Sequence, residues 1–247
     1  THFDPHLVRE LIKLGKKSYV WFDLVSEYLE DLLAKRLQDE RTYLDLDGVR
    51  SICTMLAHAI DDKSPYTYRH SVGVAKVAVK LATQAGMSQD DIVQIELAGL
   101  LHDIGKLAIP DYILNKPDQL TPEEREIMKQ HTYHTYRILS KVPAIRKTAW
   151  WGASHHEKLD GSGYPFGVDG SKLDLGCRVV AVADIFQALN EDRPYRRALP
   201  LADIEAVLKE QAANGLIDSD IVALLESNVE EYIATAKQPE PAIAGSR

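Results

Sequence analysis

Apolar residues along this chain are spaced as in α-helices rather than as in β-strands. In segment 72–85 they recur at Val74, Val77 and Leu81, and Gly86 follows, a residue type that often ends a helix. No segment alternates apolar and polar residues over the length of a strand. The pattern therefore predicts an all-α fold.

Capping signals predict where further helices begin. Ser88 starts a capping-box pattern before an apolar run, and we expect that helix to end near Gly105, with His102 and Asp103 in its last turn. Thr121 is followed by proline and then by glutamates, which predicts another helix start because proline fits the first turn and a glutamate at the third position caps it.

Two more helices are expected in the second half of the chain. One runs over residues 144–155 and is broken by the turn-forming residues of segment 160–165. The other covers residues 178–189 and is apolar on almost every side, which predicts that it is buried. Asp184 is the unusual acidic residue within this buried helix.

Composition narrows the class of protein. The 247 residues are 45% hydrophobic and 27% charged, as in an ordinary globular protein, and no apolar stretch approaches the length of a membrane span. The net charge of -8 argues against nucleic acid or anionic lipid as a partner. Two cysteines at unrelated positions, Cys53 and Cys177, indicate neither a disulfide framework nor a cysteine zinc site, so we expect a cytoplasmic protein.

Two histidine motifs carry candidate chemistry. His102 and Asp103 end an apolar run, where a metal ion would compensate their desolvation; the alternative is a capping or salt-bridged pair. His155 and His156 precede the glycine-rich segment 160–165. Adjacent imidazoles on a helix diverge by about 100 degrees, so they would reach two neighbouring ions, while the glycines would let backbone approach a ligand; the alternative is an exposed pair before a flexible turn.

His70, His131 and Asp184 lie on predicted helices beside apolar neighbours. Each alone is a candidate hydrogen-bonded core residue. Together with the two motifs they give five imidazoles and two carboxylates, a set of nitrogen and oxygen donors that suits iron, manganese, zinc or nickel better than calcium or magnesium.

The motifs resemble those of the HD-GYP phosphodiesterases. The resemblance rests on His-Asp-Ile-Gly-Lys at 102–106 and His-His-Glu-Lys-Leu-Asp-Gly-Ser-Gly-Tyr-Pro at 155–165, includes Asp-Arg-Pro-Tyr-Arg at 192–196, and extends from about Leu46 to about Tyr232. It implies an HD-superfamily helical bundle whose bimetal centre hydrolyses cyclic di-GMP to pGpG or GMP. The metal ligands that it implies are His70, His102, Asp103, His131, His155, His156 and Asp184.

Two positions depart from the family pattern. Members with a third metal carry glutamate four residues before the first ligand histidine, where this chain has Tyr66, so we expect two metals, with iron or manganese favoured and zinc or nickel as alternatives. Many members have aspartate where this chain has Gln187, which puts one substrate contact or one bond to a ligand in doubt.

The resemblance also implies roles for individual residues. Two divalent ions would supply a bridging hydroxide and stabilise charge on the phosphoryl group. Asp103 is the candidate bridge between the ions, and Lys106, one helical turn after His102, would neutralise a phosphate oxygen. The predicted substrate contacts are Lys106, Gly161, Gly163, Tyr164, Arg193 and Arg196.

The ends of the chain suggest its domain organisation. Segment 3–11 has the apolar and acidic spacing of segment 217–225, and HD-GYP domains resemble one another in such a helix start. We therefore expect residues 1–45 to be a remnant of, or linker from, an upstream sensory or second HD-GYP domain, with residues 19–41 as a connecting helix; chance similarity and an ordinary N-terminal extension are the alternatives. The phosphodiesterase domain is expected at 46–236 and a frayed tail at 237–247, and a homodimer stays open.

The sequence is compatible with three functions. The first is hydrolysis of cyclic di-GMP, and the second is hydrolysis of another cyclic dinucleotide such as cyclic GMP-AMP. The third, from a different class, is a catalytically slow receptor that binds the dinucleotide and signals through its N-terminal helices. No direct membrane insertion of this chain is expected.

Overall fold

The structure of the protein, a computed structural model, describes residues 4–26, 29, 33, 43–63, 70–192 and 197–237. The chain divides into two compact units, Thr1–Asp45 and Leu46–Arg247, each of which is described by itself. The predicted positions Phe3, Tyr66, Arg193 and Arg196, and the tail from 238 onward, lie outside the described residues.

Every regular element in the described part of the chain is a helix, so the all-α prediction is confirmed for these residues. None of the described helices is both long enough and apolar enough to cross a membrane. In chain order the elements are α1 Pro5–Leu14, α2 Ser18–Leu24, α4 Leu46–Lys63, α5 His70–Gln84, α6 Gln89–Leu101, the 3-10 helix η1 Ile104–Ala108, α7 Asp111–Leu114, α8 Pro122–Leu139, the 3-10 helix η2 Pro143–Ile145, α9 Arg146–Ala153, α10 Leu175–Asn190, α11 Leu201–Ala213, α12 Ser219–Glu226 and α13 Val229–Lys237.

The first unit contains α1 and α2. The carboxylate of Asp4 caps α1 by accepting hydrogen bonds from two backbone amides of the first turn. No residue of α1 is buried, and Leu7 and Leu11 are 67% and 66% exposed. The prediction of one continuous connecting helix over 19–41 is wrong, because α2 ends at Leu24 and the next two residues are not helical. Most of the rest of that segment lies outside the described residues.

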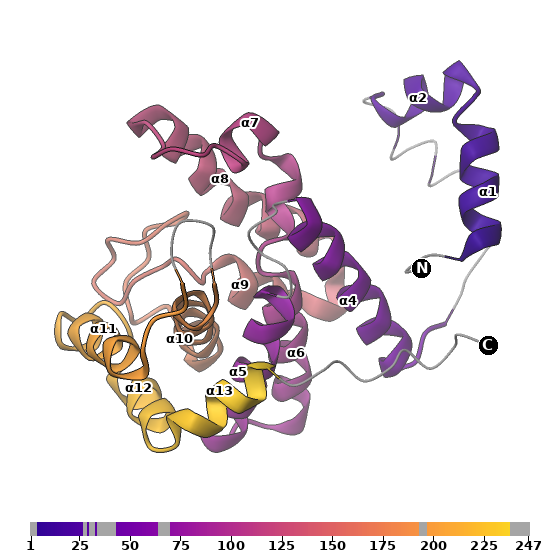
Figure 1. The fold of residues 1–247 in the computed structure, drawn as a ribbon. Helices are drawn as coiled ribbons and strands as arrows, with labels where there is room; N and C mark the ends of the chain where they lie inside the picture. The colour runs from indigo at the N-terminus through magenta and orange to yellow at the C-terminus, as the bar shows by residue number, and fades with distance from the viewer. Residues whose placement is uncertain are drawn as a thin grey trace. The chain divides into compact units, whose positions relative to one another are not determined.

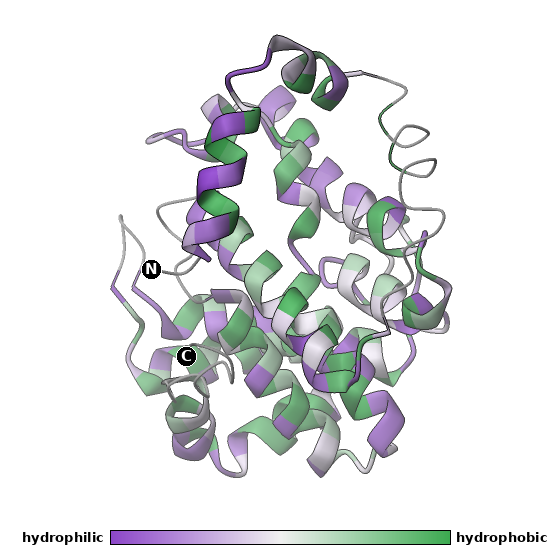
Figure 2. Ribbon diagram, turned by 90° about the vertical axis from the view of Figure 1, so that its right-hand side faces the viewer, coloured by the Kyte–Doolittle hydropathy of each residue, from purple (hydrophilic) through white to green (hydrophobic). Residues whose placement is uncertain are grey.

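Helix α5 is the centre of the second unit. It packs against α6, α10 and α13, while α8 packs against η1 and α9 (Figure 1). Seven of its fifteen residues are valine or alanine, and ten of the fifteen are buried. Hydrophobic and hydrophilic residues alternate along most of the other helices, as expected for helices with one face on a core (Figure 2).

Several predicted boundaries are confirmed. Helix α5 ends two residues before Gly86, whose φ of 72° is a conformation that favours glycine. Ser88 caps α6 through the backbone amide of Asp91. At the start of α8, Thr121 and Glu124 form the complete capping box.

The predicted end of the helix at Gly105 is wrong. Helix α6 ends at Leu101, His102 is its C-cap, and Asp103 is the N-cap of η1. Gly105, within η1, permits close approach to α8, because a Cβ there would come within 1.8 Å of the backbone oxygen of His131. The chain tightens into a 3-10 turn that brings His102 and Asp103 against α8 rather than continuing along α6.

The prediction that His155 and His156 lie within a helix is also wrong. Helix α9 ends at Ala153, and the two histidines occupy the turn that follows. Their ring centroids are 4.0 Å apart, so the side chains lie together instead of diverging as on a helix. The turn closes through a hydrogen bond from the Glu157 amide to the Ser154 carbonyl.

Candidate metal centre

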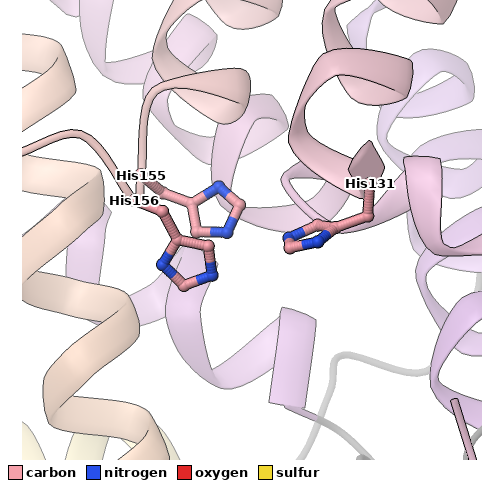
Figure 3. A group of neighbouring side chains, drawn as sticks. All are labelled: His131, His155 and His156. Atoms are coloured by element: carbon pink, nitrogen blue, oxygen red, sulfur yellow. The ribbon is translucent and has the colours of Figure 1, made fainter. Parts of the chain in front are cut away.

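The seven predicted ligands come together from separate elements of the second unit. His70 begins α5, His131 lies on α8 and Asp184 on α10, whereas the other four lie in turns or at helix ends. Six of the seven are buried, and His156 is partly exposed. Figure 3 shows the rings of His131, His155 and His156 pointing toward one another from opposite segments.

Ligand atoms gather into overlapping groups of three, in each of which the atoms lie within 4.8 Å of one another. One group lies at each end of the cluster and a third joins them. The three groups are His70, His102 and Asp184; His102, Asp103 and His155; and His131, His155 and His156.

Three of the histidines are held in the same way. The Nδ1 atoms of His102, His131 and His155 lie 2.8, 2.7 and 2.6 Å from the carbonyl oxygen three residues earlier. Because a carbonyl can only accept, each Nδ1 carries a proton and donates it. In the neutral ring this bond fixes the tautomer, so that Nε2, the atom that faces the cluster, carries the lone pair.

Asp103 lies between the groups. Its Oδ2 atom is 3.2 Å from Nε2 of His102, and its Oδ1 atom is 3.3 Å from Nε2 of His131. Lys106 approaches the same carboxylate, with Nζ 2.5 Å from Oδ2. The carboxylate can therefore serve two neighbouring positions at once, while a cationic side chain lies beside it.

Burial and neighbouring charges shift the pKa values of the histidines in the cluster in opposite directions. Burial lowers the pKa of His131 to about 4, and burial together with neighbouring histidines lowers the pKa values of His155 and His156, so these rings are neutral at pH 7 and able to coordinate a cation. Burial alone would also lower the pKa of His70, but hydrogen bonds to Asp184 and Glu191 raise it to about 10.

Several polar atoms of the cluster are buried without a hydrogen-bond partner. They are Nε2 of His102, Nε2 of His131 and Oδ1 of Asp103. Leaving such atoms unpaired costs about 1–3 kcal/mol each, and more where the group is charged. Divalent cations bound within the cluster would satisfy these atoms, so the donors fit nitrogen- and oxygen-bound transition metals.

A buried glutamate that the sequence analysis did not assign holds the loop beside the cluster. The carboxylate of Glu157 accepts backbone N–H bonds from Phe166 at 2.6 Å and from Gly167 and Val168 at 3.2 Å. The same loop carries Tyr164, whose ring centroid lies 4.9 Å from that of His156. Glu157 thereby fixes the position of Tyr164 against the histidine pair.

Close backbone packing and backbone conformation explain why glycines occupy positions 161 and 163 of this loop. A Cβ at Gly163 would come within 2.4 Å of the Glu157 backbone, and Gly161 has a φ of 79°. The close approach that Gly163 permits is therefore to the backbone of its own chain and not to a ligand. Substrate contact by Gly161, Gly163 and Tyr164 stays a prediction.

Comparison with known proteins agrees with this geometry. The family described as HD domain matches residues 54–221. The chain belongs to the HD domain family. Within that family, the HD-GYP type that the motifs resemble is confirmed by the relatives.

Relatives of this HD domain are cyclic-dinucleotide phosphodiesterases by name. A 3'3'-cGAMP-specific phosphodiesterase 1 of Vibrio cholerae is 32% identical over 243 residues, which cover 96% of this chain and 56% of that protein. A cyclic di-GMP phosphodiesterase of Thermotoga maritima is 36% identical over 255 residues, covering 98% and 68%. The chain thus spans only part of the length of these relatives.

Solved structures share the fold of this HD domain. The HD domain of the phosphodiesterase PgpH of L. monocytogenes, in complex with cyclic-di-AMP, is 20% identical, with a TM-score of 0.54 over 76% of this chain and 99% of that one. An HD-GYP protein of Bdellovibrio bacteriovorus is 19% identical, with the same TM-score over 75% and 61%. At these identities the likeness concerns the fold alone.

Proposed function

We propose that this HD domain is a metal-dependent phosphodiesterase that hydrolyses cyclic di-GMP to pGpG or GMP. The observation that carries the proposal is the convergence of five imidazoles and two carboxylates, three of whose buried atoms lack a hydrogen-bond partner. The names of the relatives supply the substrate class. Iron or manganese is the favoured metal, with two ions per chain, and zinc or nickel also suits these donors.

The proposed centre has two positions that share ligands. His70, His102 and Asp184 would hold one ion, and His131, His155 and His156 the other. Asp103 would contact both, because its two oxygens face different histidines. When bound, such a pair of ions supplies positive charge to a phosphoryl group and lowers the pKa of water to near neutrality.

The chain's own side chains would then orient the substrate. Lys106 lies at the edge of the cluster, where its ammonium group can bind a non-bridging phosphate oxygen. The flat ring of Tyr164, beside His156, is placed to stack on a base or to contact a phosphate. Burial raises the pKa of the Tyr164 hydroxyl, so that group stays protonated and donates a hydrogen bond at neutral pH.

The activity test uses the purified chain stripped of metal and reloaded with Mn²⁺ or, without air, with Fe²⁺. We expect loss of cyclic di-GMP and appearance of linear products on chromatography. Intact substrate with both metals, in protein that is folded and loaded, would overturn the proposal. Binding of the dinucleotide without turnover in that experiment would instead identify a receptor.

Cyclic GMP-AMP is the second candidate substrate, because the Vibrio cholerae relative is named for that dinucleotide. Equal concentrations of the two dinucleotides in one reaction would separate the candidates by their relative rates of loss. Both cysteines are free and buried, which is consistent with a reducing compartment, and we place the reaction in the cytoplasm.

For residues 1–45 we propose an origin in the last helices of an upstream HD-like domain. Asp4 and Asp218 each cap a helix by accepting hydrogen bonds from the amides two and three residues later. Leu11 occupies the position in α1 that Leu225 occupies in α12, yet Leu225 is fully buried and Leu11 is exposed. The likeness of the apolar face of α1 to that of a core helix supports this origin over an ordinary extension.

A further inference from the structure

His70 is held differently from the three histidines that donate to backbone carbonyls. Its Nδ1 atom faces the carboxylate of Glu191, 3.0 Å from Oε1 and 3.1 Å from Oε2. Its Nε2 atom lies 3.1 Å from Oδ1 of Asp184. A carboxylate can only accept at Nδ1, so it fixes which nitrogen of the ring turns toward the cluster.

Glu191 is itself held in place by its neighbours. It is the C-cap residue of α10 and its side chain is only 14% exposed. Gln187, one helical turn earlier, donates a hydrogen bond from Nε2 to Oε2 of Glu191 at 3.2 Å. Because Gln187 is neutral, Glu191 rather than Gln187 supplies negative charge beside Nδ1 of His70.

The absence of a side chain at position 73 makes room for this arrangement. A Cβ at Gly73 on α5 would come within 2.5 Å of the carboxamide carbon of Gln187. Any larger residue there must displace the carboxamide that supports Glu191. Contacts thus run from Gly73 through Gln187 and Glu191 to the ring of His70.

We propose that Glu191 is a positioning residue for the metal centre, acting through His70, and that Gln187 and Gly73 hold it in place. The inference rests on the proposed function, because it assumes that the cluster holds metal. A carboxylate bound to the outer nitrogen of a ligand histidine orients the ring and raises its basicity, and losing such a partner costs 10–100-fold in metal affinity. Since His70 belongs to only one of the two proposed positions, only that ion should be affected.

The test measures dissociation constants for Mn²⁺ alone, by competition with a chelating dye, on metal-free protein. The variants are Glu191→Ala, which removes the acceptor, and Glu191→Gln, which keeps an acceptor oxygen without the charge. Glu210→Ala, at an exposed residue of α11, is the control. We expect Glu191→Ala to weaken one of two equivalents 10–100-fold, Glu191→Gln to weaken it less, and the control to match wild type.

A double-mutant cycle examines the supporting residues. Gly73→Ala should weaken the same equivalent in the wild-type background and should add nothing in a Gln187→Ala background, where no carboxamide remains to be displaced. Additive effects of the two substitutions would overturn the role of Gly73. Circular dichroism and melting of the metal-free variants separate a change in affinity from a loss of fold.

The outcomes keep this inference apart from the proposed function. Wild-type affinity for both equivalents in Glu191→Ala, or equal weakening of both, would overturn the role of Glu191. If Glu191→Ala does not fold, Glu191→Gln decides, and its wild-type affinity would overturn the role of the carboxylate charge. Wild-type protein that binds two ions but hydrolyses no cyclic dinucleotide would overturn the function alone, and protein that takes up no Mn²⁺ would overturn both.

Discussion

Single side chains in the cluster are oriented before any ion arrives. His102, His131 and His155 each donate Nδ1–H to a carbonyl of the preceding turn, so their lone pairs are directed without help from a ligand. Freezing those rings on folding costs side-chain entropy. Because this entropy is lost when the chain folds, it is not lost again when a cation binds, which favours high affinity for the cation.

The role proposed for the Lys106 side chain can be tested separately from metal binding. Replacing it in Lys106→Met removes the ammonium group beside Asp103 but none of the ligand atoms. We expect kcat to fall by about 10²–10³-fold, the loss typical when one charge-stabilising donor is removed from an active site. Metal content after reloading, measured by mass spectrometry, should stay at the wild-type value.

The matched control for that experiment is Lys172→Met, at an exposed lysine in the loop before α10. It should retain wild-type kcat. A Lys106→Met enzyme with unchanged kcat would contradict a role for Lys106 in binding phosphate, and loss of metal in that variant would show that the lysine supports Asp103 instead.

The residues of the candidate metal centre could be predicted from the sequence, but their supporting partners could not. Histidine and aspartate beside apolar runs stand out because they are expensive to bury. Glu191 gives no such signal, since its partner His70 is 121 positions away in the chain and the residue follows an ordinary helix end. Glu157 was visible within its motif, but its three backbone partners exist only once the loop has folded.

At the scale of elements, a lysine joins the end of α4 to the turn that carries Lys106. Nζ of Lys63 donates to the carbonyl oxygens of Lys106, Leu107 and Ile109 at 3.2, 3.0 and 2.9 Å. Nζ also lies 3.3 Å from Asp111. The lysine thus supplies hydrogen bonds to carbonyls at and just after the end of η1, of which only that of Lys106 also accepts a backbone N–H in this turn, from Ile109.

Lys63→Met should therefore loosen η1 without removing any ligand. We expect the amides of Lys106 and Ile109, which close the turns of η1, to exchange hydrogen at least about tenfold faster, the effect of losing a little over 1 kcal/mol of local stability. Hydrogen exchange followed by mass spectrometry measures this directly. Lys116→Met is the control, because that lysine is similarly exposed but pairs with Glu124 on α8.

The glutamate under the Tyr164 loop gives a prediction for stability. Glu157→Gln leaves one acceptor oxygen for three amides and turns an NH₂ group toward one of them. We expect unfolding free energy to fall by about 1–3 kcal/mol, as for a buried donor left unpaired, and KM for the dinucleotide to rise as Tyr164 loses its support. Urea denaturation and steady-state kinetics measure the two effects, and Glu210→Gln should change neither.

Helix boundaries were predicted correctly where local sequence determines them, and wrongly where tertiary packing determines them. The capping box at Thr121 and the positive φ at Gly86 depend on neighbours in sequence, and both boundaries are confirmed. The end of α6 at Leu101 was not predicted, and the close approach of Gly105 to α8 that follows it is revealed by no local pattern.

At the scale of the whole molecule, each of the two compact units contains a helix of similar pattern, α1 in the first and α12 in the second, but the burial of the two helices differs. In α12, Ile221, Val222 and Leu225 lie in the core of the second unit. The corresponding residues of α1 include Leu7 and Leu11, which are exposed within this chain. Among the described residues, the pattern is therefore buried in α12 and exposed in α1, and the proposed upstream origin of α1 predicts this difference.

Paired truncations test that difference. Leu225→Ala deletes a fully buried side chain and should destabilise the second unit by about 2–5 kcal/mol, because it leaves a cavity in a packed core. Leu11→Ala, at the matching position of α1, should change stability by less than about 0.5 kcal/mol, since its side chain is already in solvent. A large loss for Leu11→Ala in this chain would show that α1 is already packed on a core, and the upstream-domain proposal would then lose its support. The same substitution made in a longer chain that contains an upstream HD-like domain should cost several kcal/mol in thermal or urea unfolding, because the exposed leucine would there be a core residue.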